Sequence, residues 1–428
     1  MIALLRQLWP RSSQQYSDLQ PFAYPDYVPF RPLAPDDVLY FLHVQKTAGT
    51  TFTAVLQRYF AHHEICPVAL EPLWAAIPEK QRRNYRLYAG HFGFNFYHYM
   101  RRPLVYITML RDPIDRALSN YEHILRYPEH RLHALARQLP MAQFIRHPDA
   151  CAEMNNLQVR QIGEPLGRPR LEDHCWPIDE KTLATAKRRL QSFAFFGLAE
   201  RMDDSLALLA YTFGWPPPAP AERLNAAPQR KTRDDYPPDA IAALHELNRL
   251  DIALYNWAKP IFEERLAALH GIDLDAHYRA AFSAAFGPPV PEWTLKMNQA
   301  IPTVGWYPYE PEPDCRWTGP ETCSVIDLRL QPQNYRLEID ILTSMGHDIL
   351  NGFTVTLNGA PVAVELGHRA TGDMFYYGVI PGEAVAADAL ITRLALHTPR
   401  TVSPLELGTF EDARKLGVAV RKISITPI

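Results

Sequence analysis

The sequence predicts an α/β domain built on a parallel sheet, followed by an all-β domain that folds as an antiparallel sandwich. From about residue 36 to 270, short apolar runs alternate with longer helical patterns, which is typical of a layered α/β fold. Beyond about residue 314, short β-type runs are separated by turn signals. The first apolar run leads into a small, hydroxyl-rich turn that contains Lys46. This turn predicts a phosphate loop in a P-loop-like arrangement.

Four strands and five helices are expected in the first domain. The strand runs are apolar without alternation, as in buried parallel strands, and lie at 38–44, 86–91, 105–110 and 193–198. The helical patterns lie at 50–60, 113–126, 181–191, 203–213 and 238–269. The last pattern is unusually long, and Pro260 marks a place where that helix could break.

Irregular segments flank the first domain. Residues 1–35 are expected as an extended arm, because prolines and tyrosines recur there, and 36–270 then form the α/β domain. Residues 271–313 are expected as a proline-rich linker. The sandwich follows over 314–428, with strands at 324–330, 335–342, 353–357, 375–380, 391–397 and 418–426. The pair Asn358-Gly359 predicts a type I′ hairpin turn.

Composition describes an ordinary globular protein. The chain has 428 residues, of which 47% are hydrophobic and 21% charged, so two domains are the natural expectation. The formal net charge of -3 predicts no general affinity for nucleic acid.

The cysteines and the N-terminal residues indicate the cellular compartment in which the protein is expected. Five scattered cysteines without a CxxC pair predict reduced thiols, and a bridge between Cys315 and Cys323 stays open as the less favoured alternative. The apolar run before Pro10 is too short for a signal-peptide core or a membrane span. We therefore expect a soluble cytoplasmic enzyme. Peripheral contact of the first residues with a membrane surface stays open.

The phosphate loop is not of the nucleotide-hydrolysing type. Its lysine, Lys46, precedes the small residues instead of following a Gly-x4-Gly spacer, which disfavours ATP or GTP hydrolysis. An ammonium group at the loop start can instead neutralise charge that develops on a phosphate leaving group. The alternative is a solvated lysine before an ordinary helix.

A second strand–turn–helix segment supplies another anion site. Asp112 is suited to cap the helix that starts at Pro113. Arg111 then lies at the mouth of the sheet, and Ser119 lies about two helical turns further on. An arginine and a hydroxyl together predict a second phosphate site. Two such sites on one sheet match 3′-phosphoadenosine 5′-phosphosulfate, which carries a 3′-phosphate and a 5′-phosphosulfate.

The segments HVQKTAGTTF and LRDPIDRALSNY resemble the 5′-phosphosulfate and 3′-phosphate motifs of sulfotransferases, and are most similar to those of the heparan sulfate 2-O- and 6-O-sulfotransferase group. The resemblance covers roughly residues 38–265. It implies that Lys46 stabilises the leaving phosphate and that Arg111 and Ser119 bind the 3′-phosphate. It also implies a cradle for the 5′-phosphosulfate made of Thr47, Ala48, Gly49, Thr50 and Thr51. Arg230 and Lys231 match a basic loop that folds over the 3′-phosphate side in related enzymes.

Two histidines are candidates for the chemistry. His91 ends a strand in a Gly-His pair, and the resemblance to 2-O-sulfotransferases gives it the role of catalytic base, for which an imidazole has a suitable pKa. His43, three residues before Lys46, is a substrate-binding or supporting residue, with a structural role equally open. His62, His63, His98 and His123 are assigned to structure. No metal-ligand spacing is found, so no metal is expected.

The C-terminal domain resembles a β-sandwich module appended to bacterial carbohydrate-active transferases. Trp306 or Trp317 could stack on sugar rings, but packing at the proline-rich junction is the favoured interpretation.

The sequence as a whole predicts a bacterial-type carbohydrate sulfotransferase. It would move a sulfuryl group from 3′-phosphoadenosine 5′-phosphosulfate to a hydroxyl of a glycan or glycolipid by in-line displacement. One alternative is a kinase on the same scaffold, dependent on ATP and magnesium, with Asp112 as its metal-holding residue. The other is a non-catalytic glycan-binding protein. The acceptor, the position sulfated and the oligomeric state stay open.

Overall fold

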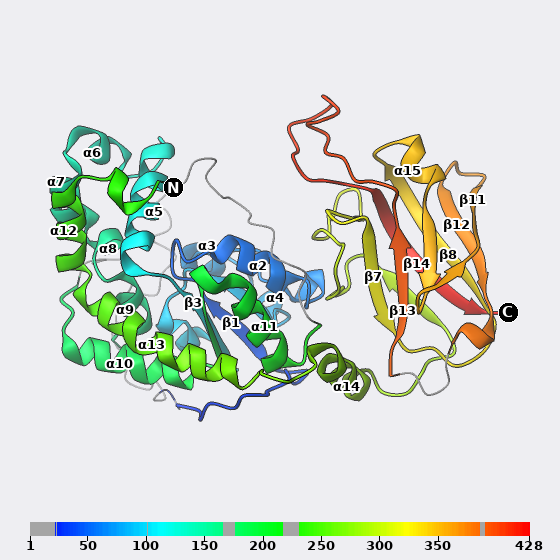
Figure 1. The fold of residues 1–428 in the computed structure, drawn as a ribbon, viewed down its shortest axis with the longest axis horizontal. Coiled ribbons are helices and arrows are strands. Elements are labelled where there is room, and N and C mark those ends of the chain that lie inside the picture. The colour runs from blue at the N-terminus through cyan, green and yellow to red at the C-terminus, as the bar shows by residue number, and fades with distance from the viewer. Residues whose placement is uncertain (1–21, 23, 101, 166–175, 217–230, 386–389) are drawn as a thin grey trace. The chain divides into compact units, whose positions relative to one another are not determined.

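The computed structural model describes residues 22, 24–100, 102–165, 176–216, 231–385 and 390–428. The chain forms two compact units (Figure 1). The first contains Met1–Thr53, Cys66–Phe213 and Pro220–Ile272, and the second contains Ala54–Ile65, Gly214–Ala219 and Asp273–Ile428. No helix in the described ranges is both long and apolar enough to cross a membrane.

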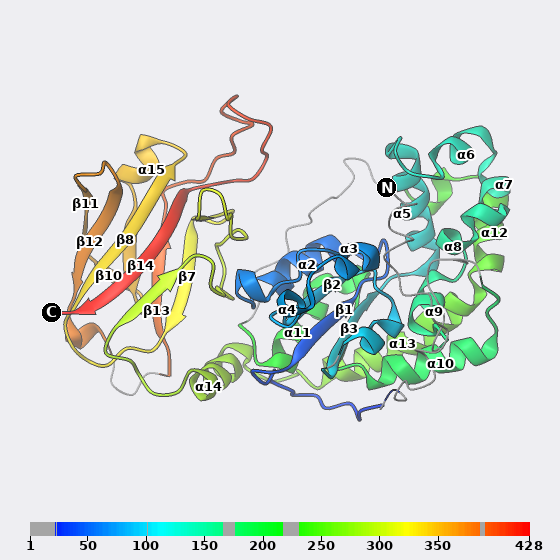
Figure 2. The same cartoon turned by 180° about the vertical axis from the view of Figure 1, so that it is seen from behind.

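A parallel four-stranded sheet forms the centre of the first unit, as predicted. Its order is β2-β1-β3-β4, and β1 and β3 lie side by side in both views (Figures 1 and 2). The strands are β1 (Val38–Leu42), β2 (Leu87–Gly90), β3 (Leu104–Leu110) and β4 (Phe195–Leu198). Leu42 pairs with both Gly90 and Thr108, so three carboxyl ends meet at one edge of the sheet. Ligands of open α/β sheets bind at this edge.

The helices expected between residues 36 and 270 are present, with one correction. They correspond to α2 (Gly49–Gln57), α5 (Pro113–Arg126), α10 (Glu180–Ser192) and α11 (Met202–Phe213). The long helix expected over 238–269 is two helices, α12 (Pro238–Leu247) and α13 (Arg249–Ala267). The break lies at Asn248, and not at Pro260, which is exposed inside α13. The Asn248 amide explains the break, because it bonds the carbonyl oxygens of Leu244 and Met154 at 3.0 and 2.9 Å.

Several short helices were not expected from the sequence. The α-helices are α3 (Glu71–Ala75), α4 (Glu79–Arg82), α6 (His133–Gln138), α7 (Met141–Arg146), α8 (Cys151–Met154) and α9 (Leu157–Ile162). The 3-10 helices in the described ranges are η2 (His62–Glu64), η3 (Phe94–Tyr99), η4 (Pro148–Ala150), η5 (Ala199–Arg201), η6 (Arg233–Asp235) and η7 (Gly382–Ala384).

The described part of the N-terminal arm is extended and lies on the first unit. The Phe22 ring meets the Phe94 ring edge-on at 4.8 Å between centroids. The guanidinium of Arg265 lies 3.5 Å from the centroid of the Tyr27 ring. Aromatic and cation–π contacts thus hold the described part of the arm, which contains no strand.

The second unit is the predicted antiparallel sandwich. One sheet has the order β10-β9-β13-β7, and the other has the order β11-β12-β8-β14-β5 with β6 paired to β14. Expected strands correspond to β7 (Cys323–Leu328), β8 (Tyr335–Ser344), β9 (Thr354–Leu357), β12 (Met374–Ile380), β13 (Thr392–His397) and β14 (Val418–Pro427). Strands β6 (Arg316–Trp317), β10 (Ala360–Val362) and β11 (Val364–His368) were not expected. Alternate residues of β8, including Leu337 and Ile339, are buried in the core between the sheets.

The turn between β9 and β10 has the backbone that its sequence predicts. Asn358 and Gly359 have φ values of 50° and 84°. A type I′ turn requires positive φ at both central residues, so the hairpin prediction is confirmed.

The range 271–313, expected as a linker, contains two regular elements. They are α14 (Leu274–Phe286) and β5 (Trp293–Lys296), which pairs with β14. Trp306 is 1% exposed, and its indole Nε1 donates to the carbonyl of Val325 at 2.8 Å. Trp306 is therefore a core residue and is closed to a sugar ring, whereas Trp317 in β6 is half-buried.

The cysteines differ from the expected set of reduced thiols. Cys66, Cys315 and Cys323 are free, so the bridge considered between Cys315 and Cys323 is not formed. Cys151 is disulfide-bonded. Cys175 lies outside the described residues.

Candidate active site

The phosphate loop between β1 and α2 has an unusual backbone. Lys46 and Ala48 have φ values of 67° and 64°, a left-handed conformation that residues with a side chain rarely adopt. Alternation of left- and right-handed residues turns successive backbone N–H groups toward a common side and forms an anion-binding nest. Gly49 then begins α2, which adds the positive end of a helix dipole. The loop is therefore built to hold an anion through its backbone.

The threonines of the loop have different roles. Thr47 is fully buried, and its hydroxyl donates to the carbonyl of Val44 at 2.8 Å. That hydroxyl closes the loop, so only the backbone of Thr47 is left for a ligand. Thr50 is exposed and Thr51 is buried in the first turn of α2.

His43 lies against the start of α2. A Cβ atom at Gly49 would fall 1.8 Å from Nε2 of His43, so the imidazole occupies the space of the missing side chain. Burial, followed by the charges of His91 and Lys46, lowers the pKa of His43 to about 3. His43 is consequently an uncharged ring at neutral pH.

His91 is anchored in a defined tautomer by the backbone of His43. Its Nδ1 lies 2.7 Å from the carbonyl oxygen of His43, and the two ring centroids are 4.3 Å apart. A carbonyl oxygen can only accept, so Nδ1 carries the proton and Nε2 of the neutral ring keeps its lone pair. The backbone N–H of His91 also donates to the carbonyl of Ala69 at 2.8 Å. This geometry is that of a base held in place.

The second anion site follows β3. The carboxylate of Asp112 accepts from the backbone N–H groups of Ile114 and Asp115 at 2.9 and 3.1 Å, as expected of a helix cap. Arg111 reaches back to the phosphate loop, where its Nη1 donates to the carbonyl of Lys46 at 3.0 Å. Ser119 lies on α5 and is half-buried. The structure thus brings Arg111 and Lys46 together.

Positive charges gather around Lys46. Burial, followed by Arg111 and Arg126, lowers the pKa of Lys46. Burial, followed by Lys46, lowers the pKa of His123 to about 4. Like charges at close range are unfavourable unless an anion lies between them, so this environment favours an anionic ligand.

His123 and Arg126 were missed as candidates by sequence reasoning, which assigned His123 to structure. Both lie on α5, four and seven residues after Ser119. Residues at this spacing share one face of a helix, and that was the signal available in the sequence.

The basic loop before α12 is only partly described. Arg230 lies outside the described residues. The ammonium group of Lys231 pairs with the carboxylate of Glu122 at 2.9 Å. Arg233, which was not a candidate, pairs with Asp112 at 2.5 Å and Asp115 at 2.8 Å. This loop therefore contacts the start of α5 through Arg233.

No cluster of three or more His, Cys, Asp or Glu side chains suited to a metal ion occurs in the part of the chain that the structure describes.

The fold and these contacts are those expected of a group-transfer domain, with two loops predicted to bind anions and an anchored histidine at one sheet edge. A model of the sulfotransferase family matches residues 33–258, which is more than half of the chain. The chain belongs to this family, and the resemblance seen in its motifs is confirmed. The match ends before the sandwich.

Two relatives illustrate the similarity. Heparan-sulfate 6-O-sulfotransferase 2 of Danio rerio is 27% identical over 282 residues, which cover 54% of this chain and 59% of the relative. Heparan-sulfate 6-O-sulfotransferase 1 of Homo sapiens is 27% identical over 277 residues, which cover 54% of this chain and 66% of the relative. The chain thus spans less than two thirds of the length of these curated relatives. Both are vertebrate proteins, so the expected bacterial type stays a prediction.

Proposed function

We propose that this protein moves a sulfuryl group from 3′-phosphoadenosine 5′-phosphosulfate to a glycan hydroxyl. The observation that carries the proposal is the anchored His91 beside a cation-rich phosphate loop, with a second anion site at Arg111. Family membership and the names of the relatives support sulfuryl transfer and a glycan acceptor over a glycolipid.

In the proposed mechanism, Nε2 of His91 takes the proton of the acceptor hydroxyl as that oxygen attacks sulfur. The S–O bond to the nucleotide breaks on the opposite side of the sulfuryl group, and its electron pair stays on the 5′-phosphate. Lys46 and the loop N–H groups stabilise the negative charge on that phosphate. Arg111 and Ser119 bind the 3′-phosphate and so fix the donor for in-line displacement. The scheme uses no metal and no covalent intermediate.

The kinase alternative loses its metal-ligand candidate. Asp112 caps α5 and pairs with Arg233, so its carboxylate is engaged in structure. A non-catalytic glycan-binding protein would not require an anchored His91 beside a cation-rich loop at Lys46, so the glycan-binding alternative does not account for these contacts. Cytoplasmic location and peripheral membrane contact stay predictions.

Two measurements test the proposal. Calorimetry should show tighter binding of 3′,5′-bisphosphoadenosine than of ATP, and a preference for ATP would favour the kinase alternative. His91→Ala should abolish sulfuryl transfer to a glycan while nucleotide affinity stays nearly unchanged. His133→Ala is the matched control, because Nδ1 of His133 also bonds a backbone carbonyl, that of Ile124 at 2.9 Å, outside the candidate site. Turnover of His91→Ala at the wild-type rate would refute the assignment.

A further inference from the structure

The backbone of Arg111 is held by a side chain from another part of the first unit. Gln158 lies in α9 and is 1% exposed. Its Oε1 accepts from the N–H of Arg111 at 3.0 Å, and its Nε2 donates to the carbonyl of Arg111 at 2.9 Å. Arg111 directly follows β3, whose pairing with β4 ends at Leu110. The Gln158 amide therefore holds both polar groups of the first residue beyond the strand.

Gln158 is itself fixed by the start of α13. The carboxylate of Asp251 accepts from the backbone N–H groups of Gln158 and Val159 at 3.1 and 2.7 Å, which caps α9. In return, Oδ1 of Asn156 accepts from the N–H groups of Leu250 and Asp251, both at 2.9 Å, which caps α13. The two helix starts thus cap each other.

Asn248 completes this polar cluster. Its Oδ1 accepts from the N–H of Asn156 at 2.9 Å, while its amide group bonds two carbonyl oxygens. Asn156, Gln158, Asn248 and Asp251 are all at most 5% exposed. A buried polar network whose members are all bonded is rigid and specifies one arrangement. Through Gln158, this network fixes the backbone of Arg111.

We propose that Gln158 is a positioning residue for the 3′-phosphate site, and that the cluster of Asn156, Asn248 and Asp251 fixes it. This inference rests on the proposed function, because it takes Arg111 as the ligand of the 3′-phosphate. The Arg111 guanidinium also bonds the carbonyl of Lys46 at 3.0 Å. A backbone shift at Arg111 would therefore move a contact to the phosphate loop as well.

The test compares two nucleotides that differ only in the 3′-phosphate. Calorimetry would give the affinities of each variant for 3′,5′-bisphosphoadenosine and for adenosine 5′-monophosphate. Gln158→Ala should lower the preference for the bisphosphate by about 10-fold or more, in line with other supporting contacts, and leave the monophosphate affinity nearly unchanged. Gln158→Glu keeps the acceptor for the Arg111 N–H but loses the donor to its carbonyl, so an intermediate loss is expected.

Gln161→Ala is the matched control, because Gln161 lies in the same helix and its buried Oε1 has no hydrogen-bond partner among the residues that the structure describes. It should keep the wild-type preference. An unchanged preference in Gln158→Ala, or an equal loss for both nucleotides, would overturn the positioning role alone. Absence of any preference in the wild type would overturn the proposed donor and this inference together. If Gln158→Ala does not fold, as judged by circular dichroism, the same criteria apply to Gln158→Glu.

Discussion

Gly49 is required where it stands because the His43 imidazole fills the position of its side chain. Gly49→Ala should displace this ring and, with it, the carbonyl that anchors His91. We expect a fall in turnover of about 10-fold or more and weaker nucleotide binding, both measured by steady-state kinetics and calorimetry.

A double variant checks that mechanism. His43→Ala/Gly49→Ala removes the ring that the new methyl group would strike, so it should recover part of the nucleotide affinity that Gly49→Ala loses. Additive losses in the double variant would contradict the steric explanation.

The uncharged state of His43 predicts acid sensitivity. Its pKa falls from the ordinary value of 6.5 to about 3 in the folded protein, so the unfolded chain binds the proton more readily between these values. The stability contributed by this group is present above about pH 6.5 and is lost as pH falls toward 3, by at most about 1.4 kcal/mol per pH unit. Urea denaturation at pH 7.5, 5.5 and 4.5 would show the decline. His43→Gln should decline less steeply than the wild type, and equal slopes would refute the assignment.

Among the elements, the break between α12 and α13 depends on one buried amide. Asn248→Ala would leave the carbonyls of Leu244 and Met154 and the N–H of Asn156 without this partner. We expect the free energy of unfolding to fall by about 3 kcal/mol, measured by urea denaturation. Pro260→Ala is the control, and should leave stability unchanged or raise it, because alanine is the better residue inside a helix. A larger loss of stability in Pro260→Ala than in Asn248→Ala would contradict the role assigned to Asn248.

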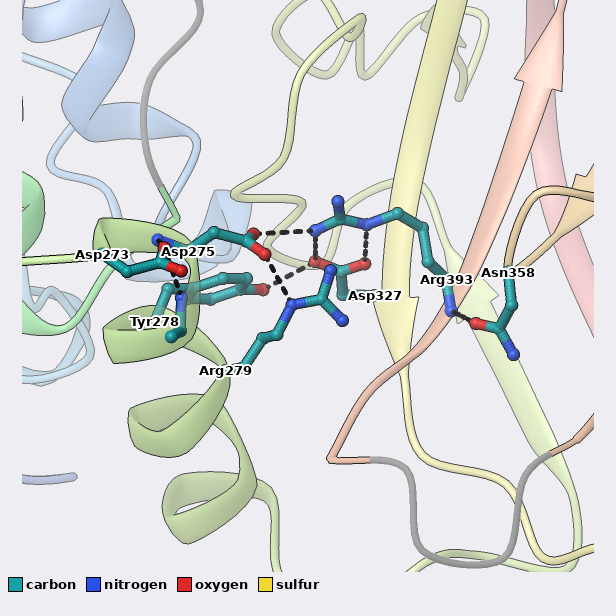
Figure 3. A network of polar contacts seen from close by, with 8 residues as sticks. Asp273, Asp275, Tyr278, Arg279, Asp327, Asn358 and Arg393 are labelled. Atoms are coloured by element: carbon teal, nitrogen blue, oxygen red, sulfur yellow. Dashed lines mark hydrogen bonds and ion pairs between the residues drawn. The ribbon is translucent and has the colours of Figure 1, made fainter.

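A buried carboxylate of the sandwich contacts helix α14 (Figure 3). The carboxylate of Asp327 accepts from Nε and Nη2 of Arg393 at 2.8 and 2.9 Å and from the hydroxyl of Tyr278 at 3.0 Å. Its side chain is 1% exposed. Asp327→Ala should therefore destabilise the second unit by about 3 kcal/mol, because the partly buried guanidinium of Arg393 loses its two-point partner and keeps the longer contact to Asp275 at 3.9 Å.

Asp348 provides a matched comparison. It bonds Arg400 with a similar two-point geometry, at 2.6 and 3.0 Å, but both side chains are largely exposed. Asp348→Ala should cost less than about 1 kcal/mol, since solvent screens exposed pairs. Equal costs in thermal denaturation would show that burial does not decide the contribution of Asp327.

At the scale of the whole molecule, the number of free thiols tests whether Cys151 is disulfide-bonded. The chain has five cysteines, and Cys66, Cys315 and Cys323 are free in the structure. Thiol titration of the denatured protein should find more thiol groups after reduction than before it, because Cys151 is disulfide-bonded. Five thiols before reduction would contradict the bond at Cys151 and would fit the expected cytoplasmic location, where disulfides are rare.

Local patterns in the sequence sufficed for most of the architecture. The apolar runs predicted the four parallel strands, and Asp112-Pro113 predicted the start of α5, because buried strands and helix caps depend on neighbouring residues. The pair Asn358-Gly359 likewise predicted the hairpin turn between β9 and β10. The sequence by itself therefore determined the two kinds of unit and the place of both anion loops at the sheet edge.

Only the tertiary structure decided how the site is held together. Gln158 and Arg111 are 47 positions apart, and Asn156 and Asn248 are 92 positions apart. The close approach of His43 to Gly49 likewise depends on how the loop folds back between β1 and α2. Hydrogen bonds and steric contacts between residues distant in sequence leave no periodic signal, because they exist only after the chain has folded. This is why the sequence could nominate Arg111 and His91 while only the fold revealed what positions them.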